Sequence, residues 1–266
     1  MATTSIRERH APRDVGDARP EQYSLPLTVF LHLLPGAALT VFIVLAAPVA
    51  RSMGLPTVFA LFAGIGLVVV PIELGYLLFH AKRTTGSFSL EQTISYRERL
   101  RPRALVLWTA GLVGWFMAFL VLSTVFADRW LAETFFSWMP ESVLQFSMVG
   151  DAGTEPVSGA AFAALIAVAL LFNGVLGPVV EELYFRGHLL PRIERLGRGA
   201  PVLNTVLFSL YHFWTPWQNP ARIIGFLPLA WAAWRKRSVQ VSMTAHVTIN
   251  LLFLLLLMGA FATGAA

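Results

Sequence analysis

The residues 177–187 hold the closest group of ionisable side chains in the apolar part of the chain. Glu181 and Glu182 are adjacent, and Arg186 follows four residues after Glu182. Helical neighbours point about 100° apart, whereas residues four apart share a face, with the acid in the favourable first position. The spacing therefore predicts a Glu182–Arg186 ion pair and leaves Glu181 unpaired, free to hold a proton or a water. An ordinary salt-bridge cluster at a helix end is the alternative for this stretch.

Two later segments place imidazole and amide groups in apolar surroundings. His212 follows Phe208 by four residues, and Asn250 follows His246 by four. On a helix His246 and Asn250 would share one face and point into a bundle. Each group alone has a structural alternative, because a buried histidine is often satisfied by a neighbour and His or Asn can join helices. Together with Glu181, they could form a hydrolytic site with a base for water and donors for an oxyanion.

Helices in a lipid bilayer must position these groups. Of the 266 residues, 56% are hydrophobic and 13% are charged, a balance unlike that of a soluble globular domain. We expect an all-α polytopic membrane protein, a bundle of about seven transmembrane helices with a polar intramembrane cavity, and an eighth span stays open. The expected spans lie near 25–50, 54–80, 103–127, 158–182, 200–216, 219–234 and 238–264. The segment 128–157 is too polar to span and predicts an interfacial excursion.

The basic residues indicate the orientation of these spans. The excess of 20 Lys and Arg over 15 Asp and Glu is concentrated in short loops, which favours a topology signal over nucleic-acid binding. The basic segments are the polar tail 1–23, 81–103, 183–199 and 235–237. We expect a retained tail with the N terminus in the cytoplasm, the C terminus outside and the plasma membrane as the location. Trp214 and Trp217 then fit an outer aromatic belt.

The three motifs in order resemble those of the CPBP intramembrane proteases, which include the CAAX prenyl endopeptidases and bacterial relatives linked to bacteriocin immunity. The resemblance rests on E-E-x-x-x-R, F-x-x-x-H and H-x-x-x-N and covers roughly residues 158–255. It implies a cavity open to the cytoplasm and the membrane, and a catalytic helical core at 158–266. The expected division is completed by the polar tail 1–23 and by 24–157, which holds three transmembrane helices and the interfacial segment. The implied roles are water activation by Glu181 and His212, oxyanion stabilisation by His246 and Asn250, and structural support from Glu182, Arg186 and Phe208.

The same family was long described as metalloproteases, so zinc held by Glu181, His212 and His246 is an alternative. We favour no cofactor, because neither histidine has an acid within a helical turn to orient it. The absence of cysteine excludes thiolate ligands and disulfides. The expected substrate is a membrane-associated protein or peptide, prenylated or not, and the sequence indicates no oligomeric state.

Two other functions compete with proteolysis. A proton-coupled transporter could use Glu73, which follows Pro71, together with Glu181, although no internal repeat relates the two halves of the chain. We expect a structural role for Glu73, because its distance of seven residues from His80 places it near the membrane interface. A noncatalytic scaffold or immunity protein is the second rival, but it would not need all four polar groups of the expected site.

Overall fold

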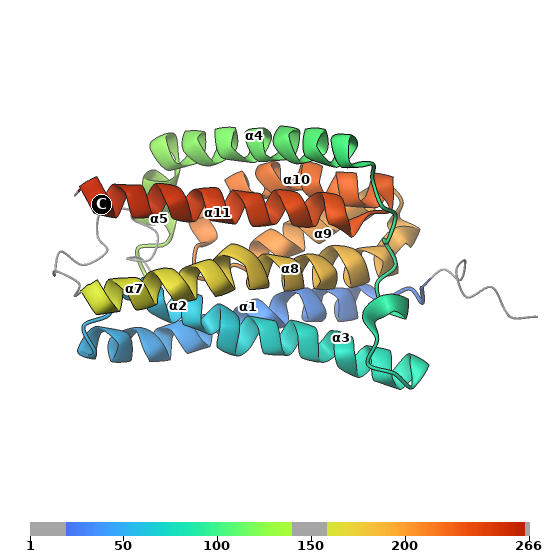
Figure 1. The fold of residues 1–266 in the computed structure, drawn as a ribbon, viewed down its shortest axis with the longest axis horizontal. Coiled ribbons are helices and arrows are strands. Elements are labelled where there is room, and N and C mark those ends of the chain that lie inside the picture. The colour runs from blue at the N-terminus through green and yellow to red at the C-terminus, as the bar shows by residue number, and fades with distance from the viewer. Residues whose placement is uncertain (1–19, 140–158, 264–266) are drawn as a thin grey trace, which may run out of the picture.

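The computed structural model describes residues 20–139 and 159–263 and shows helices that lie side by side along the long axis of the molecule (Figure 1). The N-terminal half consists of α1 (Leu25–Ser52), α2 (Val58–Gly64), the π-helical segment η1 (Ile65–Val69), α3 (Val70–Thr85), the 3₁₀ turn η2 (Leu90–Gln92), α4 (Pro102–Phe126) and α5 (Asp128–Phe135). Because α2, η1 and α3 follow one another without a break, they form one rod.

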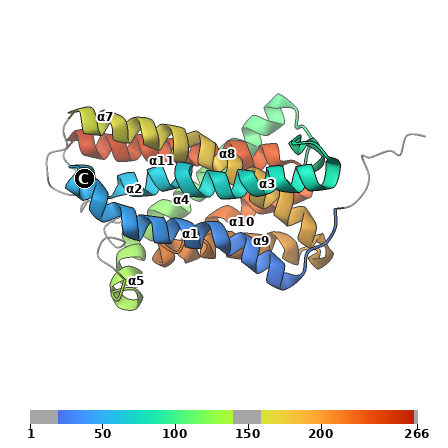
Figure 2. The same ribbon diagram turned by 90° about the horizontal axis from the view of Figure 1, so that it is seen from below.

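The C-terminal half contains the sequence motifs. Its first rod changes helix type four times, through α7 (Gly159–Val168), η3 (Ala169–Leu176, π), α8 (Gly177–Glu181), η4 (Glu182–Leu189, π) and η5 (Leu190–Leu196, 3₁₀). It is followed by α9 (Gly199–Leu210), the 3₁₀ turn η6 (Pro216–Gln218), α10 (Asn219–Lys236) and α11 (Val239–Thr263). Seen from below, α7 and α8 run beside α11, and α1 crosses near α9 (Figure 2).

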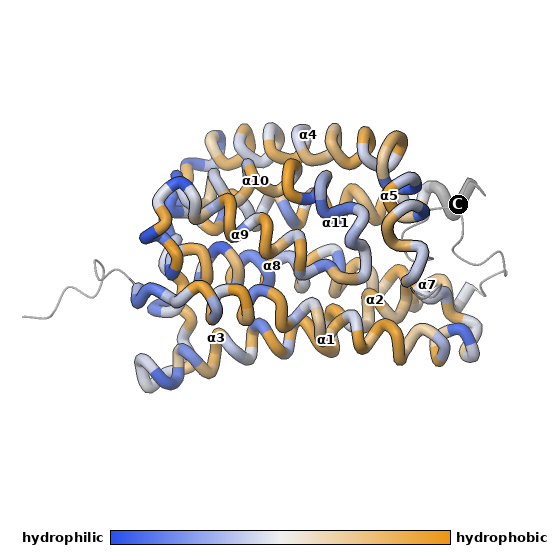
Figure 3. Tube along the Cα trace, turned by 180° about the vertical axis from the view of Figure 1, so that it is seen from behind, coloured by the Kyte–Doolittle hydropathy of each residue, from blue (hydrophilic) through white to orange (hydrophobic). Residues whose placement is uncertain are grey.

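The all-α membrane fold expected from composition is confirmed. Five helices are long and apolar enough to cross a membrane, and they are Leu25–Ser52, Val58–Thr85, Pro102–Phe126, Phe162–Leu196 and Val239–Leu256. Apolar residues cover most of the length of the rods, whereas polar residues gather at one end and within the segment labelled α8 (Figure 3). The chain is therefore an integral membrane protein with polar groups in its interior.

The expected span 200–216 is wrong in its second half. The helix α9 ends at Leu210, and residues 211–218 form a turn before α10 begins at Asn219. Ala200 at the start of α9 and Trp234 near the end of α10 pack in one apolar cluster, so this hairpin begins and ends at the same end of the bundle.

Trp214 and Trp217 are buried in the turn between α9 and α10, which contradicts the expected aromatic belt. The tail up to residue 19 and residues 140–158 of the expected interfacial excursion lie outside the described residues.

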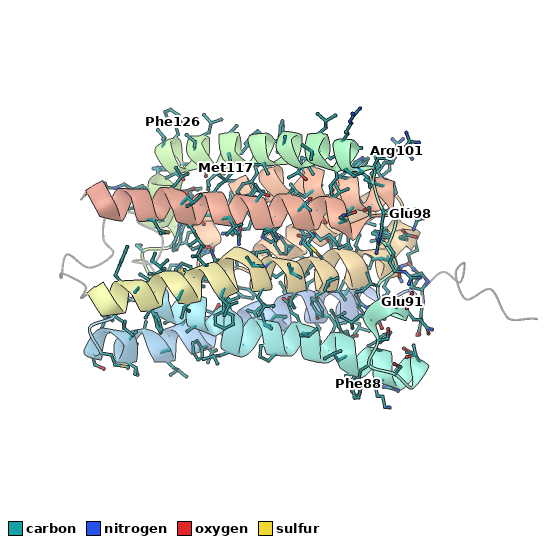
Figure 4. All side chains as sticks on the ribbon, viewed as in Figure 1. Phe88, Glu91, Glu98, Arg101, Met117 and Phe126 are labelled. Atoms are coloured by element: carbon teal, nitrogen blue, oxygen red, sulfur yellow. The ribbon has the colours of Figure 1, made fainter. Side chains whose placement is uncertain are left out.

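The loop 86–101 closes one end of the bundle, which we call the basic end. Figure 4 shows Glu91, Glu98 and Arg101 at this end and Phe126 at the other. The N–H of Glu98 donates to the Arg237 carbonyl at 2.9 Å, and the N–H of Val239 donates to the Tyr96 carbonyl at 2.9 Å.

The Tyr96 side chain ties this loop to the rod that carries the acids. Its hydroxyl donates to Glu194, which also pairs with Arg237. The pKa of the Tyr96 phenol is raised, mainly by burial and secondly by this hydrogen bond. The loop therefore holds η5 and the junction of α10 with α11 together at the basic end.

Gly36 lets α1 approach the turn that follows α9. A Cβ atom at this position would overlap the backbone carbonyl and the ring of Tyr211. Only glycine allows such an approach without displacing the turn. The N-terminal half therefore supports the segment that carries His212, although none of its residues belongs to the three motifs.

We predict that Gly36→Ala lowers the free energy of unfolding by about 1–3 kcal/mol, because the added methyl group overpacks a rigid backbone contact. Thermal unfolding in detergent or lipid measures the effect. Gly75→Ala is the matched control, since Gly75 is also helical and a Cβ there would meet no atom within 4 Å. Equal melting temperatures for Gly36→Ala and the wild type would contradict the close approach of α1.

Candidate active site

Glu182 lies at the centre of the buried polar cluster. It begins η4, its side chain has no exposed surface, and its Oε1 accepts a hydrogen bond from His246 Nδ1 at 3.0 Å. The same oxygen lies 3.4 Å from Arg186 Nη1. The ion pair expected from the four-residue spacing is thus confirmed, and one carboxylate oxygen joins the first motif to α11.

Arg186 is held by an aromatic ring as well as by its acid. The guanidinium has no exposed surface and lies over Phe208, with its central carbon 3.9 Å from the ring centroid. Its nitrogens have no hydrogen bond of good geometry to any described residue. A cation–π contact of this kind is worth most in a desolvated site. The buried charge therefore depends on Glu182 and Phe208 together, and the motif spacing predicted only the first.

Glu181 points into different surroundings from its neighbour. Its Oε1 accepts a hydrogen bond from the Tyr211 hydroxyl, and its Oε2 lies 3.7 Å from His246 Nε2. The side chain is 7% exposed. The expectation of an unpaired carboxyl is right in that no Lys or Arg contacts it among the described residues, but it missed Tyr211. That tyrosine directly precedes His212 in the sequence, and this adjacency was the available signal.

His212 lies in the turn after α9, rather than on a helix as expected. Its Nδ1 lies 2.9 Å from the carbonyl oxygen of Phe208, which can only accept. Nδ1 is therefore the protonated nitrogen, and Nε2 remains open for another partner. The Phe208 ring centroid lies 5.1 Å from that of His212 and 5.9 Å from that of His246. The structure thus brings the three motifs together around Phe208.

Arg222 at the start of α10 holds the turn in place. Its side chain donates to the side-chain oxygens of Thr215, Gln218 and Asn219, at 2.8 to 3.0 Å. Because these acceptors lie in the turn after His212 and at the start of α10, one guanidinium joins the turn to α10. No motif or spacing in the sequence indicates this bracing.

Asn250 contacts the backbone of the rod that carries the acids. Gly177 donates its N–H to the Phe172 carbonyl, and Pro178 has no N–H, so neither serves the Asn173 carbonyl. Asn250 Nδ2 donates to that carbonyl at 2.8 Å. The helix-joining alternative for Asn250 is therefore present, while the second N–H of the amide stays available to another acceptor.

Glu73 is fully buried, which its distance from His80 along the chain did not predict. Neither carboxylate oxygen has a hydrogen-bond partner among the described residues, and the group lies within electrostatic range of Glu181 and Glu182. His32, left unexplained by the sequence, has an ordinary structural role. It bridges the Thr28 carbonyl at 2.7 Å and the Asn204 amide at 3.0 Å, joining α1 to α9.

The donors do not form an evident metal site. Among residues 20–139 and 159–263, no group of three or more His, Cys, Asp or Glu side chains is arranged to hold a metal ion. The zinc alternative named three ligands, Glu181, His212 and His246. In this arrangement they do not fit a zinc ion. One sequence argument against zinc is nevertheless wrong, because acceptors from other positions do orient both rings. Glu182 orients His246, and the Phe208 carbonyl orients His212.

A comparison with protein-family models matches residues 163–252 to the type II CAAX prenyl endopeptidase Rce1-like model. All three motifs and the cluster around Phe208 fall within this segment. This segment is similar to an Rce1-like domain, which supports the CPBP protease family expected from the three motifs. No curated protein and no solved structure matched the chain in the corresponding searches.

The Rce1-like domain begins within α7 and ends within α11, so the helices α1 to α4 lie outside it. Two of those helices still contribute to its surroundings. Gly36 of α1 packs on Tyr211, and Glu73 of α3 lies near the two motif acids. The N-terminal helices therefore complete the interior of the domain.

We predict that Arg186→Ala and Glu182→Ala each lower stability by about 3–5 kcal/mol, because each strands a buried charge. Folded yield and thermal unfolding measure the effect. Arg186→Lys restores the charge but not the planar stack on Phe208, so its stability should fall between that of the wild type and that of Arg186→Ala. Normal folding of Glu182→Ala with a selective loss of activity would contradict a structural role for this acid.

Proposed function

We propose that the protein is an intramembrane endopeptidase that hydrolyses a peptide bond of a membrane-associated protein or peptide. The observation that carries the proposal is the division between the two adjacent acids. Glu182 is occupied by Arg186 and His246. Among the described residues, Glu181 meets a neutral hydroxyl donor and the edge of His246, and no Lys or Arg. Glu181 is therefore the carboxylate that can accept a proton from water.

In this proposal one proton of a water passes to the pair formed by Glu181 and the open Nε2 of His212. At the same time the water oxygen attacks the scissile carbonyl carbon. The carbonyl oxygen becomes an oxyanion as the C–O bond forms. His246 Nε2 and the second N–H of Asn250 donate to that oxyanion. When the C–N bond breaks, the proton passes from Glu181 and His212 to the leaving amine. One water is consumed, and the products are a carboxylic acid and an amine.

Glu182 sets the geometry that this role requires of His246. Because Glu182 accepts from Nδ1, the Nε2 edge of the ring faces Glu181. A ring that donates from both nitrogens can hold Glu182 on one side and an oxyanion on the other. The N terminus in the cytoplasm, which the basic loops favour, belongs to the same proposal, as does the plasma membrane as the location.

A proton-coupled transporter remains the second candidate, because Glu73 and Glu181 come from different helices and lie near each other. Cleavage assays separate the two functions. Purified protein in lipid vesicles is incubated with membrane-anchored peptides, with and without a prenyl group, and the products are identified by mass spectrometry. New termini support proteolysis, and a proton flux without cleavage would favour transport.

We predict that Glu181→Ala and His212→Ala each reduce turnover by at least about 100-fold while the protein still folds. The double variant should be no worse than either single variant, because both groups act on one water. Glu133→Ala is the matched control, since Glu133 is exposed and pairs with Arg129 at the surface. Near-normal turnover of either single variant would remove that residue from the proposed mechanism.

We also predict that cleavage survives exhaustive chelation and that the purified protein lacks stoichiometric metal. The proposed donors suit acid–base chemistry, and Asn250 is a hydrogen-bond donor rather than a good zinc ligand. Elemental analysis and activity before and after chelation make the measurement. Suppose instead that the protein holds about one zinc per chain, that activity is lost when the zinc is removed, and that activity returns when the zinc is added back. Glu181 would then be a metal ligand.

A further inference from the structure

Glu73 is a third buried carboxyl group that the proposed mechanism does not use. It lies in the first turn of α3, outside the segment that matches the family model. Its side chain has no exposed surface, and both oxygens lack a hydrogen-bond partner among the described residues. A buried carboxylate needs a cation or several donors to remain charged. The surroundings of Glu73 therefore decide its state.

The groups that face Glu73 are mostly acids and phenols. The elements packed against α3 are η1, η2, α8 and η4. Segment η1 carries no titratable side chain, and η2 carries the exposed Glu91. The remaining groups are Glu181 of α8, then Glu182, Tyr184, Arg186 and His188 of η4, Tyr211 of the turn after α9, and Tyr76 and His80 of α3 itself. Arg186 is the one buried Lys or Arg among these described groups, and it is already paired with Glu182. Lys82 and Arg83, at the other end of α3, are exposed.

We propose that Glu73 carries a proton and acts as a neutral positioning residue that leaves Glu181 as the charged member of a carboxyl pair. Two nearby carboxyl groups that pair with no Lys or Arg among the described residues do not both ionise in a buried site, and only Glu181 has the His246 ring beside it. Tyr211 donates a hydrogen bond to Glu181, whereas Glu73 receives none among the described residues. The single negative charge therefore resides on Glu181, and the proton on Glu73.

This inference rests on the proposed function only for its consequence, which is that Glu181 stays available as a base. The position of the proton does not depend on catalysis. A second negative charge at Glu73 would repel the charge on Glu181 and favour its protonation, which would remove the base. A neutral amide at position 73 should therefore preserve the site, unlike a neutral amide at position 181.

Infrared difference spectroscopy of the full chain in lipid vesicles tests the position of the proton. The wild-type spectrum minus that of Glu73→Gln should contain the carbonyl stretch of a protonated carboxyl group at neutral pH. A difference that contains carboxylate bands instead overturns the proposal. A third spectrum, of Glu181→Gln, covers the case in which Glu73→Gln does not fold. Without the neighbouring charge, the protonated band of Glu73 should disappear at a lower pH than in the wild type, and an unchanged midpoint overturns the pairing.

Cleavage assays on the same samples test the consequence. Glu73→Gln should retain turnover within about threefold of the wild type, while Glu181→Gln loses it. Leu77→Ala, one turn further along α3 and fully buried, is the control for loosened packing of that helix. Loss of turnover in folded Glu73→Gln, with Leu77→Ala active, would make Glu73 a charged participant and overturn the proposal. A wild type that cleaves no peptide defeats the proposed function, and the spectra still decide where the proton lies.

Discussion

The structure depends on one buried carboxylate oxygen, Glu182 Oε1, which serves a guanidinium and an imidazole at once. A carboxylate at membrane depth is costly unless it is paired, and so is Arg186. Each group therefore needs the other, and His246 of α11 and Phe208 of α9 contact the pair where η4, α9 and α11 meet. The position of Phe208 follows from this requirement, because its ring covers the guanidinium that Glu182 neutralises.

This arrangement also explains how adjacent acids can have different tasks. Glu182 is committed to its two partners, so its neighbour faces the turn after α9 and meets Tyr211. That turn exists because α9 stops at Leu210, and Arg222 holds it through three neutral acceptors. Gly36 lets α1 close over it. The site is thus built from an ion pair, an interrupted helix and a close approach of a helix that carries no motif.

The parts of this site that could be predicted from sequence are those that follow from helical spacing. The four-residue interval from Glu182 to Arg186 predicted their pairing, and the apolar runs predicted the membrane helices. The end of α9 could not be predicted, because 200–216 is predominantly apolar and its hydropathy does not reveal a turn. The burial of Glu73 was missed for a related reason. Its distance along the chain from His80 says nothing about which helix packs against α3.

Glu182 accepts a hydrogen bond from the protonated Nδ1 of His246 and thereby turns Nε2 of that ring toward Glu181. Nitrogen NMR of histidine-labelled protein in lipid, with His246 assigned by comparison with His246→Gln, measures this most directly. We expect that His246 Nδ1 carries a proton and that its nitrogen signal shifts in Glu182→Gln. If Nδ1 carried no proton and its signal were unchanged in Glu182→Gln, the hydrogen bond from His246 to Glu182 would be contradicted.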